Sequence, residues 1–299
     1  MNKKIKQILF PLLASLIWGT AFVAQSVSSD FIEPMTFNTA RSVVAFAVLL
    51  VILEVFQRFR KNSSRSPDSL GSRRDLVLSS LCCGTALAVA SNLQQAGISY
   101  TTAGKAGFIT ALYIVLVPIF GLFLKKAVAF PIWISELLAV VGLYFLCLSD
   151  DLTITIGDTL VLLCAAVFAI HILLIDYFTK KVNGIALSCG QFLVVSIWSA
   201  LGMLLFEHPS WNALFSCIGP ILYVGIFSSG VAYTLQILAQ KDGNPTVVSL
   251  LLSMESVFAT VSGAIILHET LSGREYLGCA LMLLAVILTQ IPIPHKTKE

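Results

Sequence analysis

Long apolar runs, separated by short polar segments, extend along almost the whole chain. A helix needs about 20 predominantly apolar residues to cross a bilayer, and ten runs reach or approach that length. They cover residues 8–28, 35–57, 76–98, 105–124, 130–148, 158–179, 185–206, 219–239, 245–268 and 275–293. Because only helices and closed barrels satisfy their backbone polar groups inside lipid, the pattern predicts an all-α integral membrane protein with ten transmembrane helices.

Composition supports lipid as the main solvent of this chain. Of its 299 residues, 57% are hydrophobic and only 12% are charged, whereas soluble domains carry about 25% charged residues. The mean hydropathy is +0.89. A net charge of +3 is too small to indicate nucleic acid as a partner, so the lipid bilayer is the expected environment.

The cysteines and the N-terminus each exclude a further class of protein. Six of the seven cysteines fall in apolar runs, and no two form a Cys-x-x-Cys pair, so neither a disulfide framework nor a zinc site is expected. Lys3, Lys4 and Lys6 precede an apolar run, as in a secretory signal. Because that run is about 20 residues long and further spans follow, we expect an uncleaved first helix.

Positive charges are distributed unevenly between the two sides of the predicted spans. With the N-terminus in the cytoplasm, 16 of the 19 lysines and arginines lie in cytoplasmic segments. Lys105 and Arg274 lie outside, and Arg41 lies within a span. Because cytoplasmic loops are enriched in lysine and arginine, the predicted topology is N-in/C-in. The long basic segment 58–74 is interpreted as a connector that fixes this topology.

The two halves of the sequence resemble each other. Residues 92–109, NLQQAGISYTTAGKAGFI, match residues 234–251, TLQILAQKDGNPTVVSLL, through a shared Leu-Gln, a turn of small residues and an apolar helix. Near the start of each half, ASLIWGTAF at 14–22 aligns loosely with AAVFAIHIL at 165–173. The chain is therefore predicted to contain an internal repeat.

The repeat predicts how the two halves insert into the membrane. Five helices per half is an odd number, so the second half must enter with the opposite orientation. The predicted units are residues 1–150 and 151–299, each a five-helix repeat. In folds with inverted repeats of this kind, the substrate site lies near the bilayer midplane, between the halves.

Several short motifs, taken in order, resemble one transporter family. They are ASLIWGTAF in the first span, GKAGFITALYIVLVP in the fourth, and LQILAQK, PTVVSLLLSMESVFA and LHETLSG across the eighth and ninth. Together they resemble the EamA-type branch of the drug/metabolite transporter superfamily. The chain departs from the family at Glu255-Ser256, where Glu-Pro is common, but it keeps Pro118 in the fourth helix. The resemblance implies that two halves rock against each other to carry small organic metabolites, often outward, across a bacterial inner (plasma) membrane.

Glu255 is the strongest candidate for a functional side chain. It falls near the centre of the ninth predicted span, where a charged acid costs on the order of 2.5–3.5 kcal/mol on insertion scales. The side chain should therefore point away from lipid and either stay protonated or face a polar cavity. We predict a substrate contact and a proton carrier; a structural hydrogen bond to a neighbouring helix is the alternative.

Two other ionisable groups lie inside predicted spans. His171 is a candidate proton relay and substrate contact, because imidazole titrates near neutral pH; its alternative is a satisfied partner within the bundle. Arg41 either binds a substrate carboxylate or extends outward to the interface. Lys105 and Glu136 are interpreted as anchors at the membrane surface.

Amides and aromatic residues complete the predicted site. Gln94 and Gln236 occupy equivalent positions in the repeat, so both are expected at the cavity, although amides also hold helices together. Trp18, Tyr113 and Tyr233 lie well inside their spans and carry polar tips, which suits a cavity wall. The predicted substrate-binding set is Trp18, Arg41, Gln94, Tyr113, His171, Tyr233, Gln236 and Glu255.

The sequence carries no motif of a soluble enzyme. It has no GxxxxGK phosphate loop and no Rossmann glycine pattern, and HETLS at His268 lacks the second histidine of HExxH. No cofactor, metal or enzymatic activity is expected, and without a nucleotide-binding domain this chain alone is not driven directly by ATP.

The leading hypothesis is a secondary transporter. Its cargo is expected to be a small molecule such as an amino acid or a related amphipathic solute, exported by alternating access, with proton coupling as a hypothesis. The spans hold one clear cation, Arg41, and one central acid, Glu255. These charges suit a neutral, zwitterionic or cationic solute better than a multiply charged anion. The alternatives are a multidrug or organic-cation exporter, a lipid-linked solute flippase and a channel-like protein. A homodimer is left open.

Overall fold

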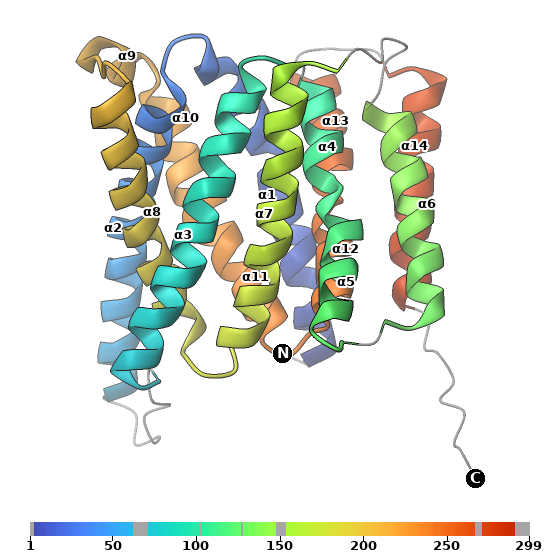
Figure 1. Cartoon of the computed structure of the whole chain (residues 1–299), viewed down its shortest axis with the longest axis horizontal. Helices are drawn as coiled ribbons and strands as arrows, with labels where there is room; N and C mark the ends of the chain where they lie inside the picture. The colour runs from blue at the N-terminus through green and yellow to red at the C-terminus, as the bar shows by residue number, and fades with distance from the viewer. Residues whose placement is uncertain are drawn as a thin grey trace.

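The computed structural model describes residues 3–61, 71–101, 103–126, 128–147, 154–266 and 271–290. Every regular element in these ranges is a helix, and the helices stand side by side as one bundle (Figure 1). The first half contains α1 (Lys3–Ser29), α2 (Pro34–Lys61), α3 (Arg73–Ile98), α4 (Ala103–Ala111), α5 (Tyr113–Phe123) and α6 (Phe130–Cys147).

The second half repeats this order with more interruptions. It contains α7 (Ile156–Phe178), α8 (Gly184–Phe206), α9 (Trp211–Ser216), α10 (Ile218–Tyr223), the π-helix η1 (Val224–Ala232), α11 (Tyr233–Gln240), α12 (Pro245–Leu252), α13 (Glu255–Ile266) and α14 (Gly273–Gln290). The eighth predicted span thus comprises α10, η1 and α11, and the fourth and ninth are each divided into two helices.

The prediction of an all-helical membrane protein is confirmed. Within the described ranges, eight helical segments are long and apolar enough to cross a membrane, and Phe130–Leu146 is a shorter apolar helix. The tenth predicted span corresponds to α14, which has 18 residues. The count of ten transmembrane helices and the N-in/C-in orientation stay predictions. The side chain of Lys105 lies outside the described part of the chain.

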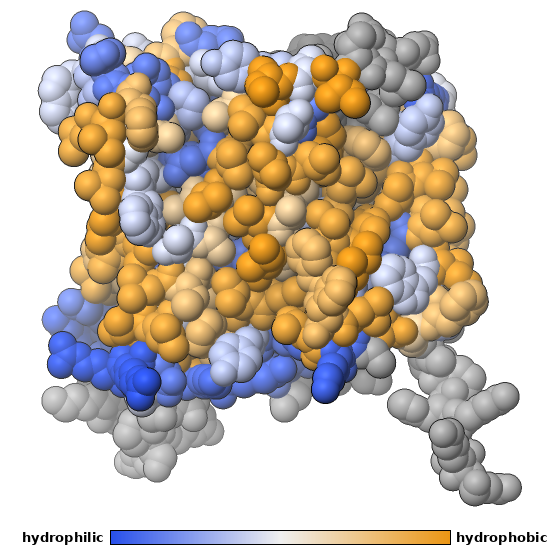
Figure 2. Space-filling view, viewed as in Figure 1, coloured by the Kyte–Doolittle hydropathy of each residue, from blue (hydrophilic) through white to orange (hydrophobic). Residues whose placement is uncertain are grey.

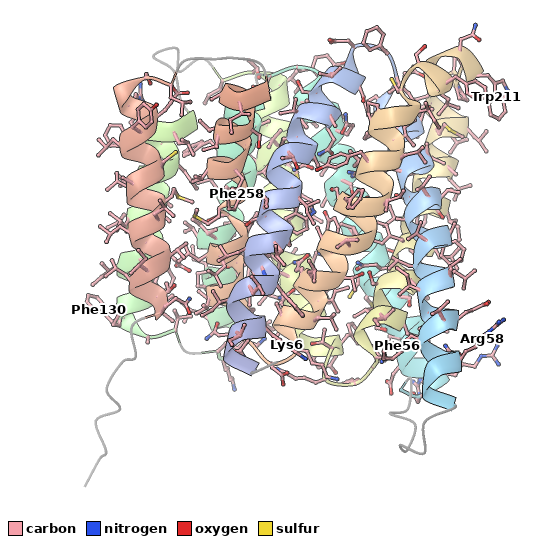
Figure 3. All side chains as sticks on the ribbon, turned by 180° about the vertical axis from the view of Figure 1, so that it is seen from behind. Lys6, Phe56, Arg58, Phe130, Trp211 and Phe258 are labelled. Atoms are coloured by element: carbon pink, nitrogen blue, oxygen red, sulfur yellow. The ribbon has the colours of Figure 1, made fainter. Side chains whose placement is uncertain are left out.

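The surface of the bundle carries an apolar band between two polar ends. Figure 2 shows hydrophobic residues across the middle of the molecule and a strongly hydrophilic strip along one end. Large apolar side chains in the band point outward, such as Leu204 of α8, which is 71% exposed. We call the hydrophilic strip the basic end; Figure 3 shows two of its charged residues, Lys6 and Arg58, at the end opposite Trp211. In Figure 1, α3 starts and α5, α7 and α11 end on this side of the bundle, so the basic end also carries Arg73, Arg74, Lys126, Lys180, Lys181 and Lys241.

The contacts between helices repeat when the two halves are exchanged. α1 packs against α12 and α13, and α7 packs in the same way against α4 and α5. α3 lies against α7, while its counterparts η1 and α11 lie against α1. α2 pairs with α8 and α6 with α14, at opposite edges of the bundle (Figure 1). α1 begins and α7 ends at the basic end, so the halves run in opposite directions, as the sequence repeat predicts.

The two halves are broken at equivalent positions. Tyr113 starts α5 and Glu255 starts α13, and each stands the same number of residues after its glutamine, Gln94 or Gln236. At the second break, the Met254 amide bonds to the Leu251 carbonyl at 3.3 Å and the Ser256 amide to the Ser253 carbonyl at 3.2 Å, each three residues back, which closes a tighter turn than in an α-helix. The chain therefore interrupts its helix at Glu255 although no proline follows that residue.

Close contact between α1 and α13 depends on Gly19. A Cβ atom at this position would lie 2.8 Å from the Glu255 carbonyl oxygen and 2.6 Å from the Phe258 Cβ. Only glycine permits the two backbones to approach this closely, since it has no side chain to collide with the other helix. This contact holds the break of the second half against the first helix of the chain.

Candidate functional site

A small cavity lies in the middle of the bundle, where the two helix breaks meet. α1, α2, α3, α5, η1, α11 and α13 are among the elements that line it. Its free volume is about 40 Å³, which is room for a few water molecules. Seven of the eight predicted substrate-binding residues lie around it, namely Trp18, Arg41, Gln94, Tyr113, Tyr233, Gln236 and Glu255.

Glu255 and Tyr113 face each other across the cavity. The Tyr113 hydroxyl donates a long hydrogen bond of 3.5 Å to Glu255 Oε1, and both side chains are buried. Each residue is the first of its helix, so the N-terminal end of α13 places its partial positive charge beside the Glu255 carboxylate. The symmetry of the repeat therefore joins equivalent positions of the two halves at one point.

Arg41 supplies a positive charge to the same cavity. Its side chain is buried, and Nη1 donates a hydrogen bond of 3.1 Å to Gln25 Oε1. Its guanidinium carbon lies 5.9 Å from the centre of the Phe37 ring, where the aromatic face attracts a cation. Arg41 thus points inward, and its Nε is a buried donor without a partner among the described residues.

Aromatic rings form one wall of the cavity. The Trp18 and Tyr233 rings lie 4.8 Å apart between centroids, and Phe192 packs edge-on against Tyr233 at 5.5 Å. Trp18 Nε1 donates a hydrogen bond of 3.2 Å to the Ser228 carbonyl. Ser228 lies in η1, and π-helical turns are found frequently at functional sites. The wall therefore combines an apolar aromatic surface with one polar group held in place, the Trp18 indole N–H.

The two equivalent glutamines differ in their bonding. Gln94 donates a hydrogen bond of 3.3 Å to the Thr110 hydroxyl. Gln236 Oε1 is buried and accepts no hydrogen bond from the residues that the structure describes. Leaving a buried acceptor unpaired costs free energy, so a donor group that reached Gln236 Oε1 would bind it favourably.

His171 is the predicted residue that does not line the cavity. It is fully buried, its Nε2 shares a hydrogen bond of 3.2 Å with Gln191 Oε1, and its ring lies edge-on to Tyr233 at 6.1 Å. Tyr233 lines the cavity, and His171 packs against its ring. The residue is positioned to support Tyr233 and is not in direct contact with the cavity in this structure.

Three polar residues of the cavity escaped the sequence analysis. Gln25 follows Trp18 and Phe22 at helical spacing on one face of α1, so this pattern contained a signal for it. Thr110 is one turn before Tyr113 on the preceding helix, which gave a weaker signal. Ser228 contributes through its backbone carbonyl, which a sequence pattern does not reveal.

Comparisons with known proteins agree on a transporter. The profile of the EamA-like transporter family matches residues 5–148 and again 155–291. An "Uncharacterized transporter" of Archaeoglobus fulgidus is 31% identical over 282 residues, covering 94% of this chain and 84% of that protein. The "Uncharacterized transporter YwfM" of Bacillus subtilis is 26% identical, covering 97% of this chain and 96% of that protein.

A named exporter and a solved structure are also similar. The "Threonine/homoserine exporter RhtA" of Salmonella typhimurium is 30% identical over 155 residues, which is 50% of this chain and 51% of that protein. One crystal structure superposes with a TM-score of 0.77 at 18% identity, covering 95% of this chain and 96% of that one, and supports the fold alone. With its apolar helices and its two family matches, this chain is a multi-pass integral membrane protein that belongs to the EamA-like transporter family.

Proposed function

We propose that this chain is a secondary transporter that exports small zwitterionic solutes, amino acids above all, by alternating access. The observation that carries the proposal is the central cavity, which Arg41 and Glu255 both line. An amino acid presents one carboxylate and one ammonium group. Glu255 matches the ammonium group and Arg41 the carboxylate, and charge-assisted hydrogen bonds of this kind are the strong ones.

The named relatives support an amino-acid cargo. RhtA is named for the export of threonine and homoserine, and its similarity extends over half of this chain. Both are small amino acids with a hydroxyl group, and that hydroxyl is a suitable donor for the unpaired Gln236 Oε1. The aromatic wall of Trp18 and Tyr233 then covers the apolar part of the solute.

The size of the cavity and the symmetry of the fold support alternating access. A free volume of about 40 Å³ is too small for an amino acid, so the halves must separate on one side before the solute binds. The proposed units, residues 1–150 and 151–299, each contribute one broken helix to the cavity. Rocking of one unit against the other, as in other inverted-repeat transporters, opens the cavity to each side in turn.

Glu255 is proposed to couple export to protons. When the substrate ammonium leaves, the buried carboxylate loses its counter-charge, and uptake of a proton removes the cost of an unpaired charge. The Tyr113 hydroxyl keeps one oxygen of Glu255 bonded during this exchange. The protein is proposed to lie in a bacterial inner membrane with its basic end in the cytoplasm, since lysine and arginine are enriched on that side.

A counterflow experiment tests the substrate class. The full chain is reconstituted in liposomes loaded with unlabelled solute, and uptake of labelled threonine, homoserine, leucine and a hydrophobic organic cation is measured. We expect saturable exchange of the amino acids. Exchange of the cation alone would support a multidrug exporter instead, and flux that does not saturate would indicate a channel.

A pH gradient tests the coupling. We expect Glu255→Gln to slow threonine exchange at equal pH, because the amide keeps a hydrogen-bond acceptor but loses the charge that pairs with the substrate ammonium. Accumulation driven by a proton gradient should be lost completely. Glu136→Gln is the matched control, because Glu136 is a second buried acid that does not line the cavity. Full gradient-driven accumulation by Glu255→Gln would remove the coupling role of Glu255 and leave the substrate class standing.

A further inference from the structure

A second pocket lies at the basic end of the bundle, apart from the central cavity. Its free volume is about 270 Å³, and α5, the end of α7 and the start of α12 line it. Its charged lining residues are one acid, Asp176, and two lysines, Lys126 and Lys180. The proposed function assigns no role to this pocket.

The second pocket and the central cavity are stacked on the same helices. On α5, Tyr113 lines the cavity and Val117 lines the pocket; on α7, Ile172 lines the cavity and Asp176 lines the pocket. Four residues of an α-helix rise about 6 Å, so the two spaces are one helical turn apart. The pocket therefore lies between the basic end and the cavity.

Asp176 is the buried centre of the pocket's charges. Its side chain is only 3% exposed, and its Oδ2 binds both the Lys126 ammonium and, at 3.4 Å, the Lys180 ammonium. Oδ1 receives no donor from the residues that the structure describes. Oδ2 thus pairs with two ammonium groups, while Oδ1 remains available to a further donor within the pocket.

The turn after α5 brings Lys126 into this position. The Lys126 amide bonds to the Gly121 carbonyl at 2.9 Å and the Lys125 amide to the Leu122 carbonyl at 2.9 Å, which is the pattern of a Schellman cap. Lys125 has a φ of 57°, a conformation in which glycine is the usual residue. The chain therefore keeps a lysine in an unfavourable backbone conformation at the point where it directs Lys126 toward α7.

We propose that this pocket is an entry site for zwitterionic substrates on the basic side of the membrane, which rests on the proposed function. The substrate ammonium binds Asp176 in place of Lys126, and the released Lys126 ammonium binds the substrate carboxylate. Every charge keeps a partner during this exchange, so the solute enters without leaving an unpaired ion in a buried place.

The exchange also links binding to opening. Lys126 belongs to the first half and Asp176 to the second, so their ion pair joins the two halves at the basic end. A substrate that separates this pair removes a contact between the halves on the route to the cavity. Binding at the entry site therefore favours the conformation in which the cavity opens toward the basic end.

The test uses two solutes that differ by one charged group. Threonine carries both charges, whereas threonine amide lacks the carboxylate. With the full chain in liposomes, half-saturating concentrations are measured separately from the two faces. We expect Lys126→Gln to raise the value for threonine at least tenfold at the basic face, and the value for threonine amide less than twofold. Asp176→Asn should raise both values at least tenfold at that face.

Matched variants separate binding from folding. Lys181→Gln is the control, because the Lys181 ammonium bonds to the Tyr177 hydroxyl and does not line the pocket; we expect changes below twofold. If Asp176→Asn is unstable, the double variant with Lys126→Gln removes both partners of the ion pair and should show the same raised values.

The outcomes distinguish the entry site from the proposed function. Equal shifts for threonine and its amide with Lys126→Gln, or equal shifts at both faces, would mean that the ion pair only holds the halves together, and would overturn the entry site. Saturable threonine exchange by the unaltered chain would uphold the proposed function in that case. An unaltered chain that carries neither solute nor any other amino acid would overturn both.

Discussion

Glu255 and Glu136 are both buried acids in apolar helices, but their surroundings differ. Glu255 is 5% exposed, bonds to Tyr113 and lines the central cavity. Glu136 is 2% exposed, lies in α6, which packs against α14, and lines neither the cavity nor the pocket at the basic end. Neither of its carboxylate oxygens has a hydrogen-bond partner among the described residues.

The difference teaches that the depth of an acid in the bundle does not by itself indicate function. The sequence suggested an interfacial anchor for Glu136 because Lys125 and Lys126 are near in the chain. The structure corrects this interpretation, since Lys126 turns toward Asp176 instead. A buried carboxyl without a donor or a cation is tolerated only in its neutral form, whereas an acid at a cavity can exchange partners.

The largest contrast is expected from the same substitution at both acids. Glu255→Leu should lower the initial rate of threonine exchange about 100-fold, because loss of one partner of a buried charge pair costs about 2–5 kcal/mol. Glu136→Leu should leave the rate within about twofold, since no ligand contact is lost. Rates per folded protein in liposomes measure both. Equal losses of exchange rate in the two variants would contradict the proposed difference between Glu255 and Glu136.

A second substitution tests whether the position of Glu255 depends on the contact between α1 and α13. Gly19→Leu should separate these helices, and overpacking of this kind costs about 1–3 kcal/mol. We expect a large loss of exchange together with a lower thermal unfolding midpoint in detergent. Gly107→Ala is the control, because a Cβ atom there meets no other atom within 4 Å. An active Gly19→Leu protein would contradict the close contact.

A smaller effect is expected from Gln25, which positions the Arg41 side chain in the cavity. Gln25→Leu removes the acceptor of Arg41, and an unsatisfied buried group costs about 1–3 kcal/mol. We expect the half-saturating threonine concentration to rise about tenfold while the maximal rate changes little. Gln191→Leu, which alters a buried glutamine outside the cavity with no bond to Gln25 or Arg41, should leave this concentration unchanged. A fall in maximal rate alone would argue that Gln25 does not act through substrate binding.

The smallest expected effect is on thermal stability, and it tests whether Glu136 lacks a partner. Glu136→Leu should raise the thermal unfolding midpoint modestly, because it removes a buried polar group without partners, whose burial costs about 1–3 kcal/mol in proteins. Glu136→Gln should leave the midpoint nearly unchanged, since the amide is equally unpaired. Circular dichroism of the purified protein measures both variants, and a lower midpoint for Glu136→Leu would reveal a partner of Glu136.

For the site residues, the sequence predicted depth within a span and equivalence between the halves, but not the contacts between helices. Apolar periodicity located Trp18, Tyr113 and Glu255 deep within spans, and the repeat placed Gln94 and Gln236 at equivalent positions. These inferences depend only on order along the chain. The position of His171 against Tyr233 and outside the cavity lining depends on which faces of α7 and α11 meet, and no pattern within either helix contains that information.

Sequence alone determined the solvent of this protein, the approximate extent of its helices and the internal repeat, because hydrophobicity and residue spacing are local properties of the chain. The tertiary structure decided that Glu255 meets Tyr113 at two equivalent helix breaks, that the Ser228 carbonyl reaches Trp18, and that Glu136 is enclosed without a partner. The physical reason is that burial and hydrogen bonding depend on which helices pack together. In this fold those contacts join residues more than 100 positions apart, such as Tyr113 and Glu255.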